Sequence, residues 1–267
     1  WMNNGVNRMS IGIQSFNTEV RQMVGRLDTK ETVLERLAAL KAYGQCSVVI
    51  DLIYGLPGQT MAVWEQDLAD LVSSGVDGAD LYQLNVFDGS DLNRDIASGK
   101  VPPAATTAMQ GDMFEFGRKY LDARAYRRLS AAHWSANNRE RSLYNILAKA
   151  GVPMFPFGSG AGGNVDGYGM MLHRALKPYE DMVSRGEKPF MALMKQSDLQ
   201  PFVNQVVSQL EQGYLNINTL IAMNPRLGEL NWLYKLWEER GLVSYNGLLY
   251  KLTAAGEFWT VNITQST

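Results

Sequence analysis

The first third of the chain alternates between strand-like and helix-like spacing of its apolar residues. Residues 6–15 alternate in polarity, as a half-buried strand does. Apolar positions recur at helical spacing over residues 28–44, and a run of branched apolar side chains follows over residues 46–54. A second helical pattern over 60–75 leads to the strand-like segment ADLYQLNVF. Because helices separate the strands, the pattern predicts an α/β fold with a parallel sheet.

Residues with strong capping preferences indicate where these helices begin and end. Asn17 is predicted to cap a short helix, and Asp28 the longer helix after it. Gly44 and Gly75 are predicted to end the two long helices, because glycine readily adopts the left-handed conformation found there.

The remainder of the chain changes character twice. After Pro102-Pro103, the pattern predicts a helix to about Arg124, a strand at YRRLSAAHW and a helix at RERSLYNILAKAG. A glycine-dense segment follows over residues 155–169. We therefore expect three parts: a partial barrel over 1–130, a glycine-rich, substrate-facing connection over 131–188, and a helical domain over 189–267.

The last part is predicted to be mainly helical, with three or four amphipathic helices and no strand before GLVSYNGLLYKL. Within that segment, Asn246-Gly247 is typical of a two-residue hairpin turn. A final helix is predicted at TAAGEFWTVNIT. Helices followed by a hairpin indicate a small winged-helix-like domain.

Composition limits the function classes. The chain has 267 residues and a formal net charge of −2, which argues against a non-specific nucleic-acid partner. No apolar run reaches the roughly 20 residues that span a bilayer, so no membrane partner is expected. The single cysteine, Cys46, excludes an internal disulfide framework and suggests a reducing, cytoplasmic setting. It also leaves this chain without the ligands of a thiolate-bound metal cluster.

Asp51 is the first candidate for chemistry, because an ionised carboxylate in an apolar strand is costly unless it is paired. It precedes the turn GLPGQT, and ligands of parallel α/β folds lie at the carboxyl ends of strands. Asp51 could equally bond a loop amide or an arginine for structural reasons. Arg26 could clamp a carboxylate through two parallel hydrogen bonds, or could be an ordinary surface arginine.

The two histidines, His133 and His173, have no neighbours at the spacing of a zinc site. Each could be an axial haem ligand, a proton donor or a structural histidine. The glycine-dense segment mixes glycine with Phe155 and Phe157, a composition that suits a flat apolar ligand pressed against backbone.

Three blocks, GVNRMSIGIQSFN, VGR and IDLIYGLPGQT, resemble the oxygen-independent coproporphyrinogen III oxidase group of radical S-adenosylmethionine (SAM) enzymes. Later blocks are similar to its haem-utilisation branch, the HutW/ChuW or anaerobilin synthase type: DGADLYQLNVF, PPAATTAMQ, HWSANNRERSLYN and PFGSGAGGNVDGYGMMLHR. The resemblance covers nearly the whole chain and is weakest over residues 190–240.

This resemblance implies the C-terminal half of a partial (β/α)6 TIM-like barrel, in which the visible strands are the fourth to sixth. Gln14, Arg26 and Asp51 match positions that contact SAM, and Asn85 follows the next strand, where such contacts also occur. The family's CxxxCxxC loop and Gly-Gly-Glu segment are absent, so we expect a fragment whose [4Fe-4S] cluster ligands lie upstream. On its own, the chain is then expected to be inactive.

The implied activity is that of a radical SAM methyltransferase in anaerobic haem breakdown, which opens the porphyrin ring and releases iron. Alternatives are a coproporphyrinogen decarboxylase and a non-catalytic haem-binding or trafficking relative. Implied partners are haem or another porphyrin and an electron donor such as flavodoxin. Candidate haem contacts are His133, Arg139, Arg141 and His173, the arginines because propionates need cationic partners.

Overall fold

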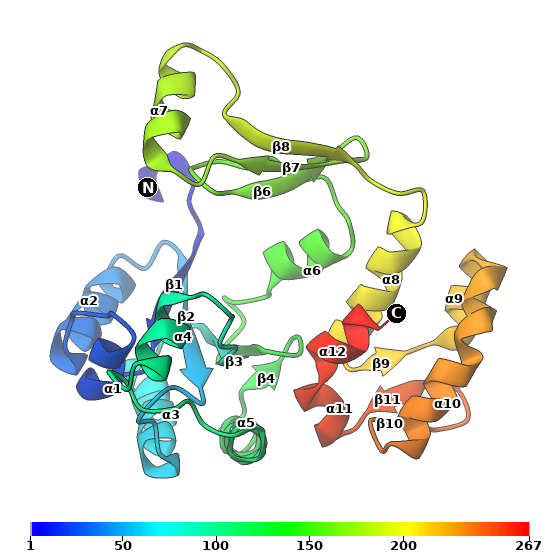
Figure 1. Ribbon diagram of the computed structural model, residues 1–267, viewed down its shortest axis with the longest axis horizontal. Coiled ribbons are helices and arrows are strands. Elements are labelled where there is room, and N and C mark those ends of the chain that lie inside the picture. The colour runs from blue at the N-terminus through cyan, green and yellow to red at the C-terminus, as the bar shows by residue number, and fades with distance from the viewer. Residues whose placement is uncertain (1, 267) are drawn as a thin grey trace. The chain divides into compact units, whose positions relative to one another are not determined.

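The computed structural model describes residues 2–266, and the chain divides into two compact units, Trp1–Arg141 and Ser142–Thr267 (Figure 1). Each unit is described by itself. The three-part division expected from the sequence stays a prediction.

The first unit is built on a five-stranded sheet in the order β1-β2-β3-β5-β4. Its strands are β1 (Arg8–Gln14), β2 (Ser47–Tyr54), β3 (Gly78–Gln83), β4 (Arg127–Arg128) and β5 (His133–Ser135). β1, β2 and β3 pair in parallel, whereas β5 pairs antiparallel to β3 and to β4. The prediction of an α/β fold with a parallel sheet is therefore confirmed.

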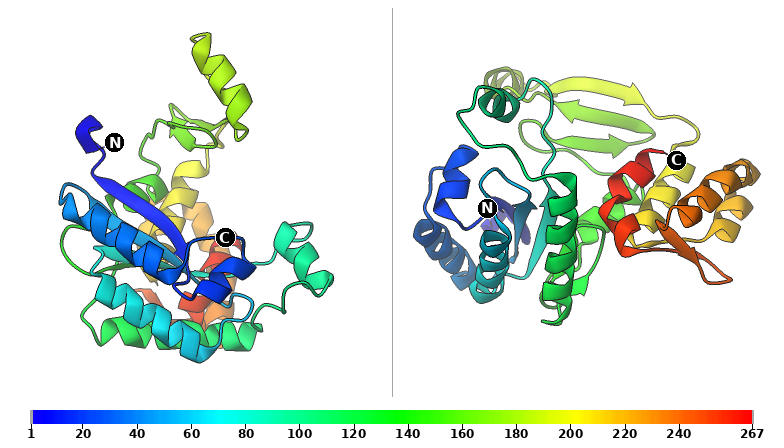
Figure 2. Two further views of the ribbon diagram at one scale, coloured as in Figure 1. Left: turned by 90° about the vertical axis from the view of Figure 1, so that its left-hand side faces the viewer. Right: turned by 60° about the horizontal axis from the view of Figure 1, so that its bottom comes forward.

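Three helices of the first unit, α2 (Lys30–Ala42), α3 (Met61–Ser74) and α5 (Thr107–Asp122), cover one face of the sheet (Figure 2). The unit also contains η1 (Met2–Asn4), α1 (Thr18–Met23) and α4 (Asp91–Ala97). The Asn17 side chain caps α1 by accepting from the Val20 amide, and Gly75 ends α3 in the left-handed conformation, both as predicted.

The predicted cap of α2 was wrong by one residue. Thr29 is the N-cap, and its hydroxyl accepts a hydrogen bond from the Thr32 amide. Asp28 instead pairs with Arg36. The cause is that both residue types cap helices well, so the sequence alone did not separate two adjacent candidates.

The two faces of β2 have opposite character. Val48, Ile50 and Leu52 are fully buried, and Tyr54 on the same face stacks against Trp64 of α3 with ring centroids 5.8 Å apart. Side chains of a strand alternate between faces, so Asp51 points to the face opposite the helices. The register places Gly12 of β1 and Asp80 of β3 beside Asp51. This face is the polar face of the sheet.

The second unit contains an antiparallel sheet of β6 (Gly162–Val165), β7 (Tyr168–Leu172) and β8 (Phe190–Lys195), in that order. Two helices belong to the same part of the chain, α6 (Leu143–Lys149) and α7 (Leu176–Ser184). The expectation of no strand between 189 and 241 was wrong, because FMALMK forms β8. Its apolar run lacks polar alternation, which hid the strand.

The end of the chain packs helices around a second antiparallel sheet, ordered β10-β11-β9. The elements are α8 (Gln200–Glu211), β9 (Tyr214–Leu215), α9 (Ile217–Met223), η2 (Pro225–Leu230), α10 (Asn231–Glu239), β10 (Val243–Tyr245), β11 (Tyr250–Leu252), α11 (Ala254–Phe258) and α12 (Thr260–Gln265). Leu210, Leu215, Leu220 and Tyr234 are the most deeply buried members of its core. Helices followed by a hairpin agree with the predicted winged-helix-like domain.

Two details of this domain differ from the prediction. The hairpin loop spans residues 246–249, because the Asn246 side chain accepts hydrogen bonds from the Leu248 and Leu249 amides and widens the turn. The final helix is two helices, which meet at Trp259. Among the described residues, no helix has the length and apolar character needed to cross a membrane.

Candidate cofactor site at the carboxyl edge of the parallel sheet

Gln14, Arg26 and Asp51 converge on Gly12 in the polar face of the sheet. A Cβ atom placed on Gly12 would lie 3.0 Å from Gln14 Nε2 and 3.5 Å from Arg26 Nη2. Asp51 is the register partner of Gly12 on β2. The structure therefore brings together three of the four residues that the resemblance assigned to SAM. Gly12, Gln14, Arg26 and Asp51 form the Gly12 cluster.

Gln14 is held in an unusual state at the end of β1. Its backbone has a φ of 67°, which side chains other than glycine rarely adopt, and the β1–β2 register shifts between Gly12 and Gln14. Its Oε1 atom is buried without a hydrogen-bond partner among the described residues. Such an atom is costly to bury, and strained backbone concentrates at functional sites.

Asp51 is partly buried, and its carboxylate accepts a 2.8 Å hydrogen bond from the Ser10 hydroxyl. Burial raises the pKa of Asp51; the hydrogen bond from Ser10 opposes the shift and the nearby charge of Asp80 adds to it. Ser10 thus gives Asp51 one structural hydrogen-bond partner, the kind of role that the sequence left open for this residue. One hydrogen bond leaves most of the carboxylate's accepting capacity for a further donor.

A buried network that sequence reasoning missed fixes the rim around this site. Asp67 of α3 accepts from the Ser15 hydroxyl at 2.8 Å and from the Phe16 amide at 2.7 Å. Gln59 donates to Asp67 and accepts from the Gly55 amide, which ties the loop after β2 to the residues after β1. Despite these hydrogen bonds, burial raises the pKa of Asp67.

The position of Asp67 in the sequence could have indicated that this carboxylate is buried. It falls at helical spacing between Trp64 and Leu71, so a carboxylate occupies the buried stripe of an apolar helix. A buried carboxylate needs partners, and here they are the two strand ends. The GLPGQT turn therefore shapes the rim through Gln59.

A second set of polar contacts lies at the end of β3, close to the chain after β2. Gln110 of α5 donates to the Leu84 carbonyl at 3.2 Å and accepts from Gln83 at 2.8 Å. Gly55 has a φ of 87°, and a Cβ there would come within 2.6 Å of Gln110, so glycine is required at that position. Asn85, the fourth assigned residue, follows β3 and is exposed.

His133, a candidate haem contact, lies fully buried in β5. Its Nδ1 atom is 2.8 Å from Asp80 Oδ1, and its Nε2 atom is 3.3 Å from Glu140 Oε1. Burial lowers the pKa of His133, but the hydrogen bonds and charges of Asp80 and Glu140 outweigh burial and raise the pKa to about 9. This geometry gives His133 two carboxylate partners within the protein, and haem ligation by His133 stays untested.

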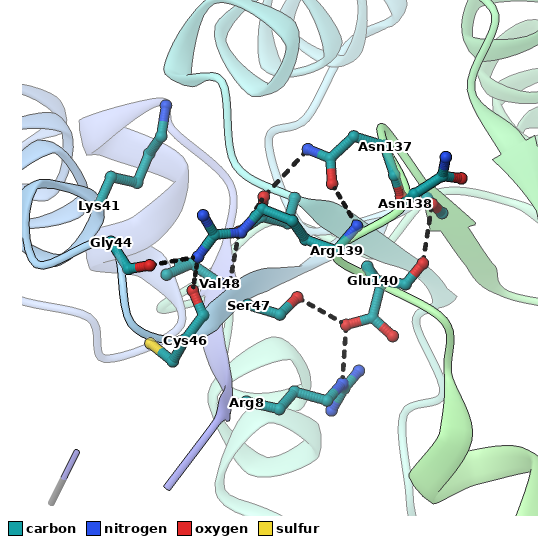
Figure 3. A network of polar contacts seen from close by, with 12 residues as sticks. Arg8, Lys41, Gly44, Cys46, Ser47, Val48, Asn137, Asn138, Arg139 and Glu140 are labelled. Atoms are coloured by element: carbon teal, nitrogen blue, oxygen red, sulfur yellow. Dashed lines mark hydrogen bonds and ion pairs between the residues drawn. The ribbon is translucent and has the colours of Figure 1, made fainter. Parts of the chain in front are cut away.

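The candidate haem contacts Arg139 and Arg141 also lie in the first unit. Arg139 Nη2 donates to the Gly44 and Cys46 carbonyls at 2.9 and 2.8 Å, just before β2 begins (Figure 3). It therefore lies at the amino edge of the sheet, opposite the Gly12 cluster. Arg141 is exposed and donates to the Asn138 carbonyl. His173 belongs to the second unit, where its backbone pairs with Pro189 and Gly160.

The Gly12 cluster fits the polar end of SAM. Gln14 Oε1 can accept from an ammonium group, the Arg26 guanidinium can bind a carboxylate, and Asp51 can accept from hydroxyls. Ligands for a [4Fe-4S] cluster are not found in the described part of the chain. Cys46 is the chain's sole cysteine and is buried, and no group of three or more metal-ligating His, Cys, Asp or Glu side chains occurs among the described residues.

The first part of the chain matches a known protein family. Residues 1–71, which carry Gln14, Arg26 and Asp51, match the model of the radical SAM superfamily. This stretch of the chain is therefore similar to radical SAM proteins.

Individual relatives extend the match. Anaerobilin synthase from Escherichia coli O157:H7 is 35% identical over 98% of this chain and 58% of its own length. Oxygen-independent coproporphyrinogen III oxidase from Helicobacter pylori J99 is 26% identical over 94% of this chain and 58% of its length. The chain thus spans a little over half the length of these two proteins.

The fold also has a solved counterpart. The structure of coproporphyrinogen III oxidase (HemN) from Escherichia coli, described as a radical SAM enzyme, matches 98% of this chain and 64% of its own chain. The TM-score is 0.77 at 19% sequence identity. The α/β fold with a TIM-like parallel sheet and a helical C-terminal part is therefore confirmed.

Proposed function

We propose that this chain is part of a radical SAM enzyme of anaerobic haem utilisation, which methylates and opens the porphyrin ring and releases iron. The observation that carries the proposal is the 35% identity to anaerobilin synthase, which extends over 98% of the chain. The Gly12 cluster supports it, because three side chains with the chemistry to hold SAM meet at one edge of the sheet.

In this proposal a [4Fe-4S] cluster and SAM supply the radical chemistry when bound. The chain's own residues bind and orient. Arg26 would hold the carboxylate of SAM, Gln14 its amino group and Asp51 its ribose hydroxyls. Asp67 and Gln59 would keep the two strand ends in place beneath them. Asn85 remains a proposed fourth contact, and the cluster ligands would come from outside this chain.

The proposed substrate is haem, and the proposed electron donor is a small redox protein such as flavodoxin. Coproporphyrinogen decarboxylation is the second candidate, because the Helicobacter pylori oxidase matches 94% of the chain. A non-catalytic haem-trafficking role is the third outcome that the test below separates.

The test uses the protein expressed from its full reading frame and reconstituted without oxygen. Haem, SAM and a strong reductant are added, and the porphyrin absorption, 5′-deoxyadenosine and product mass are followed. The proposal expects loss of the haem band together with a methyl-derived gain in product mass. Asp51→Ala is expected to weaken SAM binding, while the exposed Asp198→Ala serves as the matched control.

Other outcomes contradict the proposal in distinguishable ways. Stable haem with decarboxylation of coproporphyrinogen would assign the protein to the oxidase group. Haem binding without SAM cleavage would favour trafficking. Unchanged SAM affinity in Asp51→Ala would remove Asp51 from the site.

A further inference from the structure

The second unit contains an apolar pocket of about 610 Å³ that the Gly12 cluster does not include. Its walls come from α7, β7, the start of β8 and the segment 155–157. A volume of this size falls within the range of small-molecule sites, about 300–1,000 Å³.

The floor of the pocket is one face of the β6–β7–β8 sheet. Met170 and Leu172 alternate along β7 and so point to the same face, and both line the pocket. Phe190, the register partner of Leu172 on β8, lines it as well. Leu193, the partner of Met170, continues the apolar face and is 56% exposed.

A second wall is a short segment pinned against β6. Met154 forms a bridge with Asn164, in which each backbone amide donates to the other's carbonyl at 2.7 and 3.0 Å. A Cβ on Gly163 would lie 2.4 Å from the Met154 carbonyl oxygen, so the close approach requires glycine. The bridge holds Phe155 and Phe157 at the pocket while leaving them 68% and 86% exposed.

Two side chains of α7 complete the enclosure. Tyr179 and Val183 are separated by one helical turn and share a face, and both line the pocket. Aromatic rings on several sides favour a flat ring system, because aromatic faces stack in offset parallel or edge-on arrangements.

One cation at the pocket wall has no charge partner among the described residues. Lys188 lines the pocket and forms no ion pair with the described residues, whereas the neighbouring Glu187 is paired with Arg185 at 2.8 Å. A carboxylate on an apolar ligand would complement Lys188. A plain lipid tail or an apolar peptide side chain would leave that ammonium unused.

We propose that this pocket binds the substrate tetrapyrrole, with the ring against Phe155, Phe157 and Met170 and one propionate paired with Lys188. The inference rests on the proposed function, since it names the surface that takes the haem. It gives the glycine-dense segment 155–169 a physical role, because Gly163 lets the phenylalanine segment approach the sheet.

The test measures haem binding to the full-reading-frame protein without reductant or SAM, by absorption titration. Phe157→Ala is expected to weaken haem binding about tenfold, from lost apolar contact. Its side chain is largely exposed, so the fold is not at risk. Met194→Ala is the matched control, because Met194 is 69% exposed on β8 and pairs with Gly169, on the opposite face.

Lys188→Gln tests the charge. It is expected to weaken binding of haem severalfold and to leave the affinity for haem dimethyl ester unchanged, because the ester has no carboxylates. Equal losses for haem and ester would overturn the role of Lys188. Under turnover, Phe157→Ala should raise KM for haem more than it lowers kcat.

The outcomes separate the two proposals. Normal haem turnover in the parent, with Phe157→Ala and Met194→Ala both binding haem like the parent, would overturn the pocket and leave the proposed function standing. No haem binding or turnover by the parent would overturn both. A loss in Met194→Ala equal to that in Phe157→Ala would place the ligand elsewhere and overturn the pocket.

Discussion

The two edges of the β1–β2–β3 sheet use polar side chains in opposite ways. At the amino edge, Glu140 is buried and accepts from Arg8 and Ser47, each at 2.9 Å (Figure 3). Its Oε1 atom also lies 3.3 Å from His133 Nε2. At the carboxyl edge, Gln14 Oε1 is buried without a partner among the described residues. Polar groups that satisfy one another stabilise a fold, whereas a buried group left unsatisfied is available to a ligand.

The contrast separates stability from binding within one sheet. The amino-edge network draws its members from β1, β2, β5 and the chain after β5, so it joins segments far apart in sequence. At the carboxyl edge, Asp51 accepts one hydrogen bond from Ser10, and Gln14 Oε1 has no hydrogen-bond partner among the described residues. Mutations at the two edges should therefore change different measurements.

The largest expected effect is at Glu140. Glu140→Gln removes the charge that partners Arg8 and His133 in a buried setting, and breaking such a network typically costs about 3–5 kcal/mol in the free energy of unfolding. Denaturant unfolding would measure it, with the exposed Glu19→Gln as control. A change below about 0.5 kcal/mol, the range of ordinary surface substitutions, would contradict a stabilising role for the network at the amino edge.

His133 should make the free energy of unfolding depend on pH. Its folded pKa of about 9 exceeds the ordinary value of 6.5, so its contribution is fully present below about pH 6.5 and is lost as pH rises through 9. Unfolding free energies between pH 6 and 10 should therefore fall in the parent. A His133→Asn variant should show a flatter profile over that interval, and an equal slope in both proteins would contradict the ion pairs.

Substitution of Asp51 should change SAM binding rather than stability. Asp51→Asn keeps the shape and a hydrogen bond to Ser10, so stability should change little, while SAM affinity should fall about tenfold through a weakened charge-assisted hydrogen bond. Equilibrium binding of SAM to the reconstituted protein would measure the change. A large stability loss with unchanged SAM affinity would make Asp51 part of the structural network.

The smallest effect should come from Gly12→Ala. The new Cβ would press on the Gln14 amide at about 3 Å, a flexible side-chain end that can shift. We expect a severalfold loss of SAM affinity with a stability change below about 1 kcal/mol. Gly169→Ala, whose Cβ would have its nearest neighbour at 3.9 Å, is the matched control. Equal SAM affinity in both variants would exclude a role for the space beside Gly12.

Local signals made much of the fold predictable from the sequence. Alternation and helical spacing located β1, β2, β3 and their helices, and Gly75 ends α3 as predicted. Asp51 stood out because a carboxylate in an apolar strand needs a reason. These patterns involve residues close together in the sequence, where local backbone geometry determines the secondary structure.

Longer-range features were not predictable in the same way. The register of β3 and β5 brings Asp80, which is 53 residues away, to His133. Glu140 reaches His133 from the chain that follows β5. β8 was missed because its side chains are apolar on both faces. Asp67 was overlooked although it interrupts a buried helical stripe, because its role depends on the two strand ends it joins.

The most direct test of the account follows the methyl group of SAM. Haem is incubated anaerobically with the reconstituted full-reading-frame protein, a reductant and SAM labelled in its methyl carbon, and the tetrapyrrole product is analysed by mass spectrometry. The account predicts an opened tetrapyrrole that carries the label, together with released iron. Unlabelled, intact haem beside consumed SAM would contradict it.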